Sequence, residues 1–222
     1  MKKDPNKEQK KLYDESIKII LLGEVYTGKT SLINTYIKNE FKTDIESTTA
    51  PSYLNKIIKV ENKTYMVSIW DTAGQEQFRS MNKIFIKDSN IVLFIYDITR
   101  KKTFNELTFW VEYVESCIGK DNALYGVVGN KLDLFDKEEE LKKDNIYYQF
   151  EIVDTNQGKD FAEKIGAEFL ETSAKEKAPG FDNLIYNLID NYANKNMFSV
   201  KSDAISLSTE HPKLNKKKKC CD

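Results

Sequence analysis

The chain has 222 residues, of which 40% are hydrophobic and 31% are charged. This length favours one domain with a sizeable core, and the composition excludes a disordered or fibrous chain. Lys and Arg total 34 while Asp and Glu total 35, so there is no overall basic field and we expect no nucleic acid among the partners.

Short apolar segments alternate with amphipathic ones along the chain. Apolar runs predict strands at residues 17–22, 53–60, 63–70, 91–96, 124–129 and 168–170. Apolar residues at helical spacing predict helices at residues 29–38, 104–118, 159–165 and 181–192. Glu61 and Asn62 separate the second and third strands as a hairpin turn would, so one strand should be antiparallel. The alternation predicts an α/β fold with a mostly parallel sheet and helices on both faces.

The two ends of the chain lack hydrophobic periodicity. We therefore expect a flexible extension at residues 1–13, one domain at 14–195 and a disordered tail at 196–222. Residues 136–143 are dense in charge and are interpreted as a solvated loop or short surface helix, with a docking site as the alternative.

A glycine-rich loop follows the first predicted strand and has the pattern G-x-x-x-x-G-K-[ST]. A turn that opens a helix leaves backbone N–H groups unpaired, and these groups can bind phosphate oxygens. Lys29 adds a charge for the outer phosphates, and the Thr30 hydroxyl can bind the Mg²⁺ that bridges them. The residues expected to contact the nucleotide here are Gly23, Val25, Tyr26, Thr27, Gly28, Lys29, Thr30 and Ser31.

A second phosphate-side motif follows the third predicted strand. Asp71 ends this strand, where its carboxylate can hold Mg²⁺ through water. Gly74, three residues later, can donate its N–H group to a terminal phosphate.

Two further loops favour guanine over adenine. Asn130, Lys131 and Asp133 follow a predicted strand in the pattern N-K-x-D. The Asp133 carboxylate can accept hydrogen bonds from the ring N–H and exocyclic amine of guanine, a pair of donors that adenine lacks. A backbone N–H in the segment after the last strand can donate to the guanine carbonyl, and the residues expected there are Ser173, Ala174 and Lys175.

With these motifs in this order, the chain resembles the Ras-like small GTPases, and within them the Rab branch. Trp70 before Asp-Thr-Ala-Gly-Gln-Glu and residues 78–81 and 96–99 are similar to this branch, and residues 46–54 are most similar to its endosomal subgroup. The resemblance implies a P-loop NTPase fold with a six-stranded sheet. It also implies a switch in vesicle traffic that binds Mg²⁺, cycles between GTP and GDP, and hydrolyses GTP.

The resemblance assigns roles to residues outside the loops above. Thr48 becomes the switch threonine, which gives its hydroxyl to Mg²⁺ and its N–H to the terminal phosphate. Phe41 packs against the base, and Gln75 orients the attacking water. After hydrolysis the segments near residues 41–54 and 72–84 relax. The aromatic residues that would face effectors, with plain core aromatics as the alternative, are Tyr53, Trp70 and Phe85.

The resemblance also implies partners, and departures from the family pattern put some of them in doubt. The implied partners are an exchange factor, a GTPase-activating protein, effectors and a chaperone of the prenyl-delivery or GDP-dissociation type, with the protein itself a monomer. Val25 and Tyr26 stand where the family has small residues, so we predict slow intrinsic hydrolysis. Ala50 and Pro51 replace the usual glycine and small residue of the first switch, so the set of partners is open.

The last residues combine charge with paired thiols. Residues 216–219 are all lysine, and Cys220 and Cys221 follow them. Two isoprenoid chains on these thiols would anchor the chain, while the lysines face an anionic cytoplasmic leaflet. We therefore expect prenylation of both cysteines, residence on the cytoplasmic face of vesicle or endosome membranes, and a cytosolic pool bound to the chaperone.

Other functions are excluded or kept as alternatives by simple observations. The longest apolar run, residues 91–96, is too short to cross a bilayer, and a single histidine, His211, cannot form nucleophilic triads or histidine-based zinc sites. One alternative is a module that binds GTP and recruits effectors with little or no useful hydrolysis. Another is an ATP-using P-loop kinase, which would leave the N-K-x-D motif without a purpose.

Overall fold

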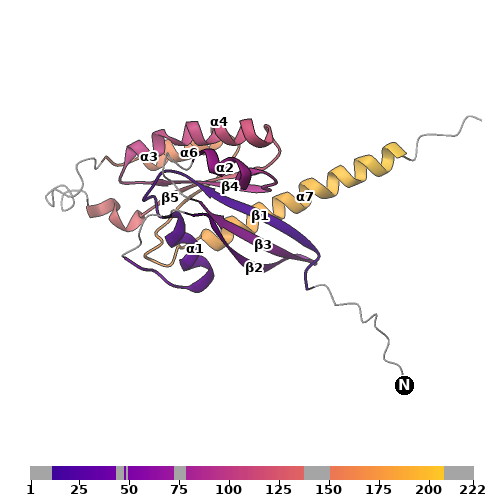
Figure 1. Ribbon diagram of the computed structural model, residues 1–222, viewed down its shortest axis with the longest axis horizontal. Coiled ribbons are helices and arrows are strands. Elements are labelled where there is room, and N and C mark those ends of the chain that lie inside the picture. The colour runs from indigo at the N-terminus through magenta and orange to yellow at the C-terminus, as the bar shows by residue number, and fades with distance from the viewer. Residues whose placement is uncertain (1–11, 44–47, 49, 73–78, 138–150, 208–222) are drawn as a thin grey trace, which may run out of the picture.

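The computed structural model describes residues 12–43, 48, 50–72, 79–137 and 151–207 (Figure 1). Several predicted features fall outside this part of the chain, among them Gly74, Gln75, the paired cysteines and most of the charged segment at 136–143.

A six-stranded sheet forms the centre of the domain, with the strand order β2-β3-β1-β4-β5-β6. β2 and β3 pair in the antiparallel sense, whereas every other neighbouring pair is parallel. The predicted mixed sheet is therefore confirmed. The strands are β1 (Glu15–Leu22), β2 (Ser52–Val60), β3 (Lys63–Asp71), β4 (Ile91–Asp97), β5 (Leu124–Asn130) and β6 (Glu168–Glu171).

Helices cover both faces of this sheet (Figure 1). α1 (Lys29–Lys38) and α7 (Phe181–Leu207) pack on one face. The opposite face carries α2 (Arg79–Ile86), α3 (Lys101–Asn105), α4 (Leu107–Ile118) and α6 (Thr155–Lys164). A short 3-10 helix, η2 (Leu132–Lys137), follows β5.

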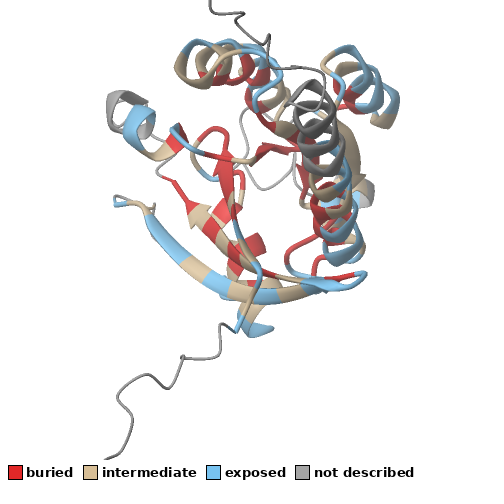
Figure 2. Ribbon diagram, turned by 90° about the vertical axis from the view of Figure 1, so that its right-hand side faces the viewer, coloured by how far each residue is buried: buried red, intermediate tan, exposed pale blue. Residues whose placement is uncertain are grey.

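Alternation along the strands divides the core into two layers. On β4, Ile91 and Leu93 pack on the α1 and α7 side, whereas Val92 and Phe94 pack on the α4 and α6 side. Successive side chains of a strand point to opposite faces, so a central strand covered on both faces is apolar throughout. All seven residues of β4 are buried for this reason, and the buried residues gather around the sheet (Figure 2).

Helix boundaries differ from the sequence-based expectations in several places. The helix predicted at 104–118 is two helices, α3 and α4, and the helix predicted at 159–165 begins earlier, at Thr155. Asp154 caps that earlier start, since its side chain accepts from the Asn156 N–H at 2.8 Å. Two helices were not predicted. α2 follows the second phosphate-side motif directly, and η2 is very short.

The last helix, α7, continues to Leu207 and projects beyond the rest of the domain (Figure 1). It therefore passes residue 195, where the sequence places the end of the domain. The division into extension, domain and tail stays a prediction. Within the described residues, we find no helix with the length and hydrophobicity needed to cross a membrane.

The carboxyl ends of β1, β3, β4, β5 and β6 lie at the same edge of the sheet, because these strands are mutually parallel. In open α/β sheets this edge is where ligands bind. Each of the predicted nucleotide motifs begins at the end of one of these strands.

Candidate nucleotide site

A pocket of about 330 Å³ lies at this edge of the sheet. Residues from the glycine-rich loop, the segment before β2 and the loops after β3, β5 and β6 line it. A volume of this size falls within the range of small-molecule sites, about 300–1,000 Å³. The residues in its wall are Val25, Tyr26, Gly28, Lys29, Thr30, Ser31, Phe41, Lys42, Thr43, Thr48, Thr72, Asn130, Lys131, Asp133, Leu134, Ala174 and Lys175.

Two glycines allow the loop between β1 and α1 to take its shape. Gly23 has φ 145° and Gly28 has φ 89°, both in a region that side chains rarely adopt. A Cβ atom on Gly23 would collide with the Ile95 carbonyl oxygen, and one on Gly28 would collide with the Asn130 side-chain nitrogen. The loop therefore lies directly against β4 and against the N-K-x-D motif.

The N-terminus of α1 is arranged to receive an anion. Gly28 occupies the N-cap position without a side-chain cap, and the first turn has no acidic residue. By contrast, α6 is closed by a capping box in which Asp154 and Gln157 satisfy the backbone donors. The first N–H groups of α1 and the positive end of its dipole therefore face the pocket, an arrangement that favours phosphate.

Lys29 is the cation of this loop and is 5% exposed. Its ammonium donates to the carbonyl oxygens of Gly23 at 2.9 Å and Glu24 at 2.8 Å. Burial lowers the pKa of Lys29 to about 8, against the opposing influence of Asp71 and Glu24. An anionic ligand in the pocket would offset this desolvation of the ammonium.

Three oxygens that the sequence assigns to Mg²⁺ come together beside Lys29. The Thr30 hydroxyl lies 2.7 Å from the Thr48 hydroxyl and donates to Asp71 Oδ2 at 2.7 Å. Burial raises the pKa of Asp71, while the Thr30 hydrogen bond and the Lys29 charge lower it. The other carboxylate oxygen, Asp71 Oδ1, is buried and has no hydrogen-bond partner in the described part of the chain.

Such a buried, unpaired carboxylate oxygen beside two hydroxyls is a donor set that suits a hard divalent cation. The residues present therefore fit Mg²⁺.

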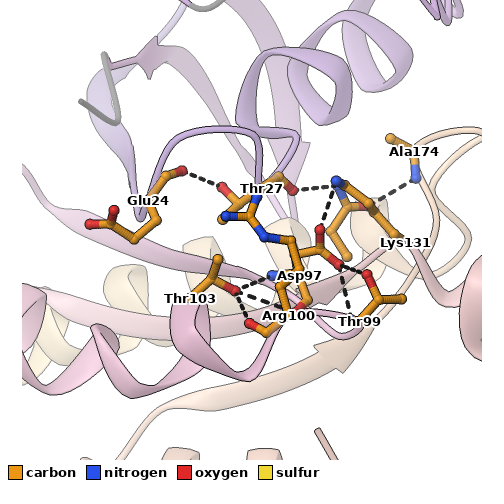
Figure 3. A network of polar contacts seen from close by, with 9 residues as sticks. Glu24, Thr27, Asp97, Thr99, Arg100, Thr103, Lys131 and Ala174 are labelled. Carbon is orange, nitrogen blue, oxygen red and sulfur yellow. Dashed lines mark hydrogen bonds and ion pairs between the residues drawn. The ribbon is translucent and has the colours of Figure 1, made fainter. Parts of the chain in front are cut away.

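The N-K-x-D motif joins three parts of the site. The buried Asn130 side chain donates to the Thr27 carbonyl at 2.8 Å and accepts from the Ala174 N–H at 3.1 Å. Thr35 on α1 also donates to the Ala174 carbonyl, at 3.0 Å. The glycine-rich loop, the loop after β5 and the loop after β6 are thus held together by side-chain hydrogen bonds (Figure 3).

Asp133 is fixed by the loop after β6. It accepts a hydrogen bond from the Ser173 hydroxyl at 2.6 Å and lies 3.7 Å from the Lys175 ammonium. Its side chain is 9% exposed, so the carboxylate is largely shielded from solvent. A shielded carboxylate in the wall of the pocket can distinguish a base that offers two donors from one that does not.

Most of the predicted nucleotide residues thus share one pocket, and three others are hydrogen-bonded to residues of its wall. Gly23, Thr27 and Ser173 do not line the pocket, yet they accept from or donate to residues that do. Gly74 and Gln75 lie outside the described residues.

Sequence reasoning missed four residues of the pocket wall and one residue behind it. Each of the four wall residues directly follows a predicted site residue in the chain or is one position further on, and this adjacency could have indicated them. The wall residues missed were Lys42, Thr43, Thr72 and Leu134. The missed residue behind the wall is Asp97, an acidic residue that ends the otherwise apolar strand β4.

The aromatic residues predicted to face effectors form one contact cluster on the surface. The rings of Tyr53 and Trp70 stack with centroids 4.8 Å apart, and those of Trp70 and Phe85 lie 5.7 Å apart. Tyr53 is 53% exposed, which is more than a plain core residue would be. The three side chains come from β2, β3 and α2.

Comparison with known proteins is consistent with this site. The model of the Ras family matches residues 18–194. The chain is 34% identical over 159 residues to Ras-related protein Rab-22A from Homo sapiens, a match that covers 72% of this chain and 75% of that protein. It is 35% identical over 173 residues to Ras-related protein Rab-21 from Homo sapiens, covering 78% of this chain and 70% of that protein.

Proposed function

The chain belongs to the Rab branch of the Ras family of small GTPases, and from this we propose that it binds GTP and GDP with Mg²⁺ and hydrolyses GTP as a switch in membrane traffic. The observation that carries the proposal is the convergence of the glycine-rich loop, the Thr30, Thr48 and Asp71 oxygens and the Asp133 carboxylate around one pocket.

In this proposal the phosphates lie against the N-terminus of α1. The loop N–H groups bind the phosphate oxygens, and the Lys29 ammonium leaves the Gly23 and Glu24 carbonyls to meet the outer phosphates. Thr30, Thr48 and Asp71 would hold Mg²⁺ directly or through water. When bound, Mg²⁺ supplies positive charge that stabilises the charge developing on the phosphates during transfer.

The switch depends on Thr48 and on the proposed water-orienting residue, Gln75. Thr48 precedes β2, and its hydroxyl lies 2.7 Å from the Thr30 hydroxyl at the pocket. Loss of the terminal phosphate would remove its N–H contact and release the segment before β2, and the aromatic cluster adjoins it at Tyr53. Partners that read this change are proposed to be effectors, with an exchange factor and a GTPase-activating protein acting on the pocket.

Two experiments on the purified chain test this function. Mass analysis of the nucleotide that remains bound through purification should find GDP or GTP and no adenine nucleotide. A multiple-turnover phosphate-release assay with GTP and Mg²⁺ should then give continuing release. Bound ATP or ADP would refute the guanine assignment, whereas GTP without turnover would favour a binding module.

A specific observation favours that second candidate, a module with little useful hydrolysis. Tyr26 lines the pocket with its bulky side chain 60% exposed, and its φ of 63° is unusual for such a residue. Val25, beside it, also lines the pocket. Bulk at this point crowds the space where the terminal phosphate and the attacking water must align.

Removing this bulk is expected to speed the chemical step. The double variant Val25→Ser/Tyr26→Ala should hydrolyse bound GTP about tenfold faster in a single turnover, because small displacements of the reacting groups strongly affect rate. Rapid-mix phosphate detection on the preloaded protein measures this. The control is Tyr186→Ala, an exposed tyrosine on α7 outside the pocket wall, which should leave the rate unchanged. Equal rates in the double variant and the parent chain would count against crowding.

We also propose that Cys220 and Cys221 carry prenyl groups which attach the chain to the cytoplasmic face of intracellular membranes, delivered by a chaperone of the GDP-dissociation type. The support is the adjacency of two thiols to four lysines. Cys220→Ser/Cys221→Ser should move the protein from the membrane pellet to the soluble fraction of a cell lysate. Cys117→Ser, on α4, is the matched control and should still pellet with membranes. A double variant that pelleted like the parent chain would refute the lipid anchor.

A further inference from the structure

Asp97 is a fully buried carboxylate behind the candidate nucleotide site. It is the last residue of β4 and pairs in register with Asn130 of β5. Its exposure is 0%, and it does not line the pocket. Burying a carboxylate is expensive unless each oxygen finds a partner, so its contacts indicate what the charge does.

The two oxygens of Asp97 have different partners (Figure 3). Oδ1 accepts from the Thr99 N–H at 2.9 Å and from the Thr99 hydroxyl at 2.6 Å, which closes the turn after β4. Oδ2 lies 2.7 Å from the Lys131 ammonium, in an ion pair whose angles do not make a hydrogen bond. One oxygen therefore serves the local turn, and the other holds a residue of the neighbouring loop.

Lys131 is an unusual residue to hold in this way. It lies in the pocket wall between Asn130 and Asp133, and its φ of 72° places it in the left-handed region. Its side chain is 27% exposed, although lysine side chains normally extend into water. Pairing with a buried carboxylate restricts the rotamers that a free lysine would sample, and it draws the ammonium inward.

We propose that Asp97 is a positioning residue for nucleotide binding, because it holds Lys131 and thereby the conformation of the loop that receives the base. The inference rests on the proposed function and adds a residue that does not itself line the pocket. The Thr99 contacts would suffice to close the turn after β4. The Lys131 contact is the one that connects Asp97 to the nucleotide site.

Asparagine at position 97 separates the two roles. Its side-chain oxygen can still accept from Thr99, while its amide nitrogen replaces Oδ2 and places a donor before the Lys131 ammonium. Asp97→Asn should therefore raise the dissociation rate of a fluorescent GDP analogue about tenfold, within the coupling range seen for contacting residues. Its unfolding temperature without nucleotide is measured alongside.

The matched control is Thr103→Val. Thr103 is buried and accepts from the Asp97 backbone N–H at 3.0 Å, but it does not touch the Asp97 carboxylate. This variant should lower the unfolding temperature and leave the GDP dissociation rate unchanged. If Asp97→Asn behaves in the same way, with normal GDP dissociation, Asp97 has only a structural role and the proposal is overturned while the nucleotide-binding function stands.

A double-mutant cycle covers the case in which Asp97→Asn fails to fold. Lys131→Met removes the ammonium, so adding Asp97→Asn to it leaves no unpaired buried charge. The double variant should release GDP no faster than Lys131→Met alone, because the contact through which Asp97 acts is already gone. A further tenfold rise would overturn the proposal. Failure of the parent chain to bind GDP at all would overturn both the proposal and the proposed function.

Discussion

Asp133→Asn is expected to lower the affinity for GDP about 1,000-fold and to make xanthosine diphosphate the preferred ligand. Truncating one partner of a buried, charged hydrogen-bonded pair costs about 2–5 kcal/mol, and 4 kcal/mol corresponds to this factor. In the proposed function, the Asp133 carboxylate accepts hydrogen bonds from the ring N–H and the amine of guanine. Asparagine presents one acceptor and one donor, which suits xanthine because xanthine has a carbonyl where guanine has the amine.

Equilibrium titrations with fluorescent GDP and xanthosine diphosphate measure both affinities on one protein preparation. The gain for xanthosine diphosphate is an internal control, since a misfolded variant would lose both ligands. Asp160→Asn, an exposed site on α6, provides the matched substitution and should change neither affinity. An Asp133 variant that kept GDP and gained nothing for xanthosine diphosphate would remove Asp133 from base recognition.

Lys29→Met is expected to weaken GDP and GTP binding at least 100-fold. Lys29 is 5% exposed and burial lowers the pKa of its ammonium to about 8, so the ammonium is held in the pocket at a desolvation cost that phosphate would offset. Loss of one partner of a buried ion pair costs about 3–5 kcal/mol, which exceeds the 2.7 kcal/mol of a 100-fold change. Methionine keeps the length of the side chain without its charge.

Isothermal titration with GDP and Mg²⁺ measures this loss. Lys38→Met is the control on the same helix, because Lys38 lies in the last turn of α1 and is exposed. It should bind GDP as the parent chain does. Retention of normal GDP affinity by Lys29→Met would show that Lys29 does not contact the phosphates, and this part of the proposed function would fail.

Local sequence patterns were sufficient to predict the fold class and most of its elements. β4 is recognisable from its continuous apolar run, and α1 from its apolar residues at helical spacing. The boundaries of the helices were harder to predict from the sequence, because tertiary contacts decide where a helix ends. Periodicity runs through residues 104–118, and the chain nevertheless breaks into α3 and α4 around Glu106.

The sequence predicted those residues of the candidate site that lie within contiguous motifs. In the motif around Lys29 and in the motif ending at Asp133, a few neighbouring residues are enough to indicate what the motif binds. Asp97 was missed as part of the site because its partner, Lys131, lies 34 positions away and no local pattern connects the two. Thr48 was assigned to the site only through resemblance, because it lies 18 positions from Thr30, the residue that it contacts.

The sequence by itself determined which chemical groups are available: loops that open helices for phosphate, carboxylates at strand ends, and an alternation of strands and helices that produces a parallel sheet. Only the tertiary structure decided which groups meet. The parallel strands bring their carboxyl ends to one edge, and there the buried Asn130 side chain joins the glycine-rich loop to the loop after β6. The physical reason is that hydrogen-bond and ion-pair energies depend on distances of a few ångströms in space, whereas sequence patterns record only separation along the chain.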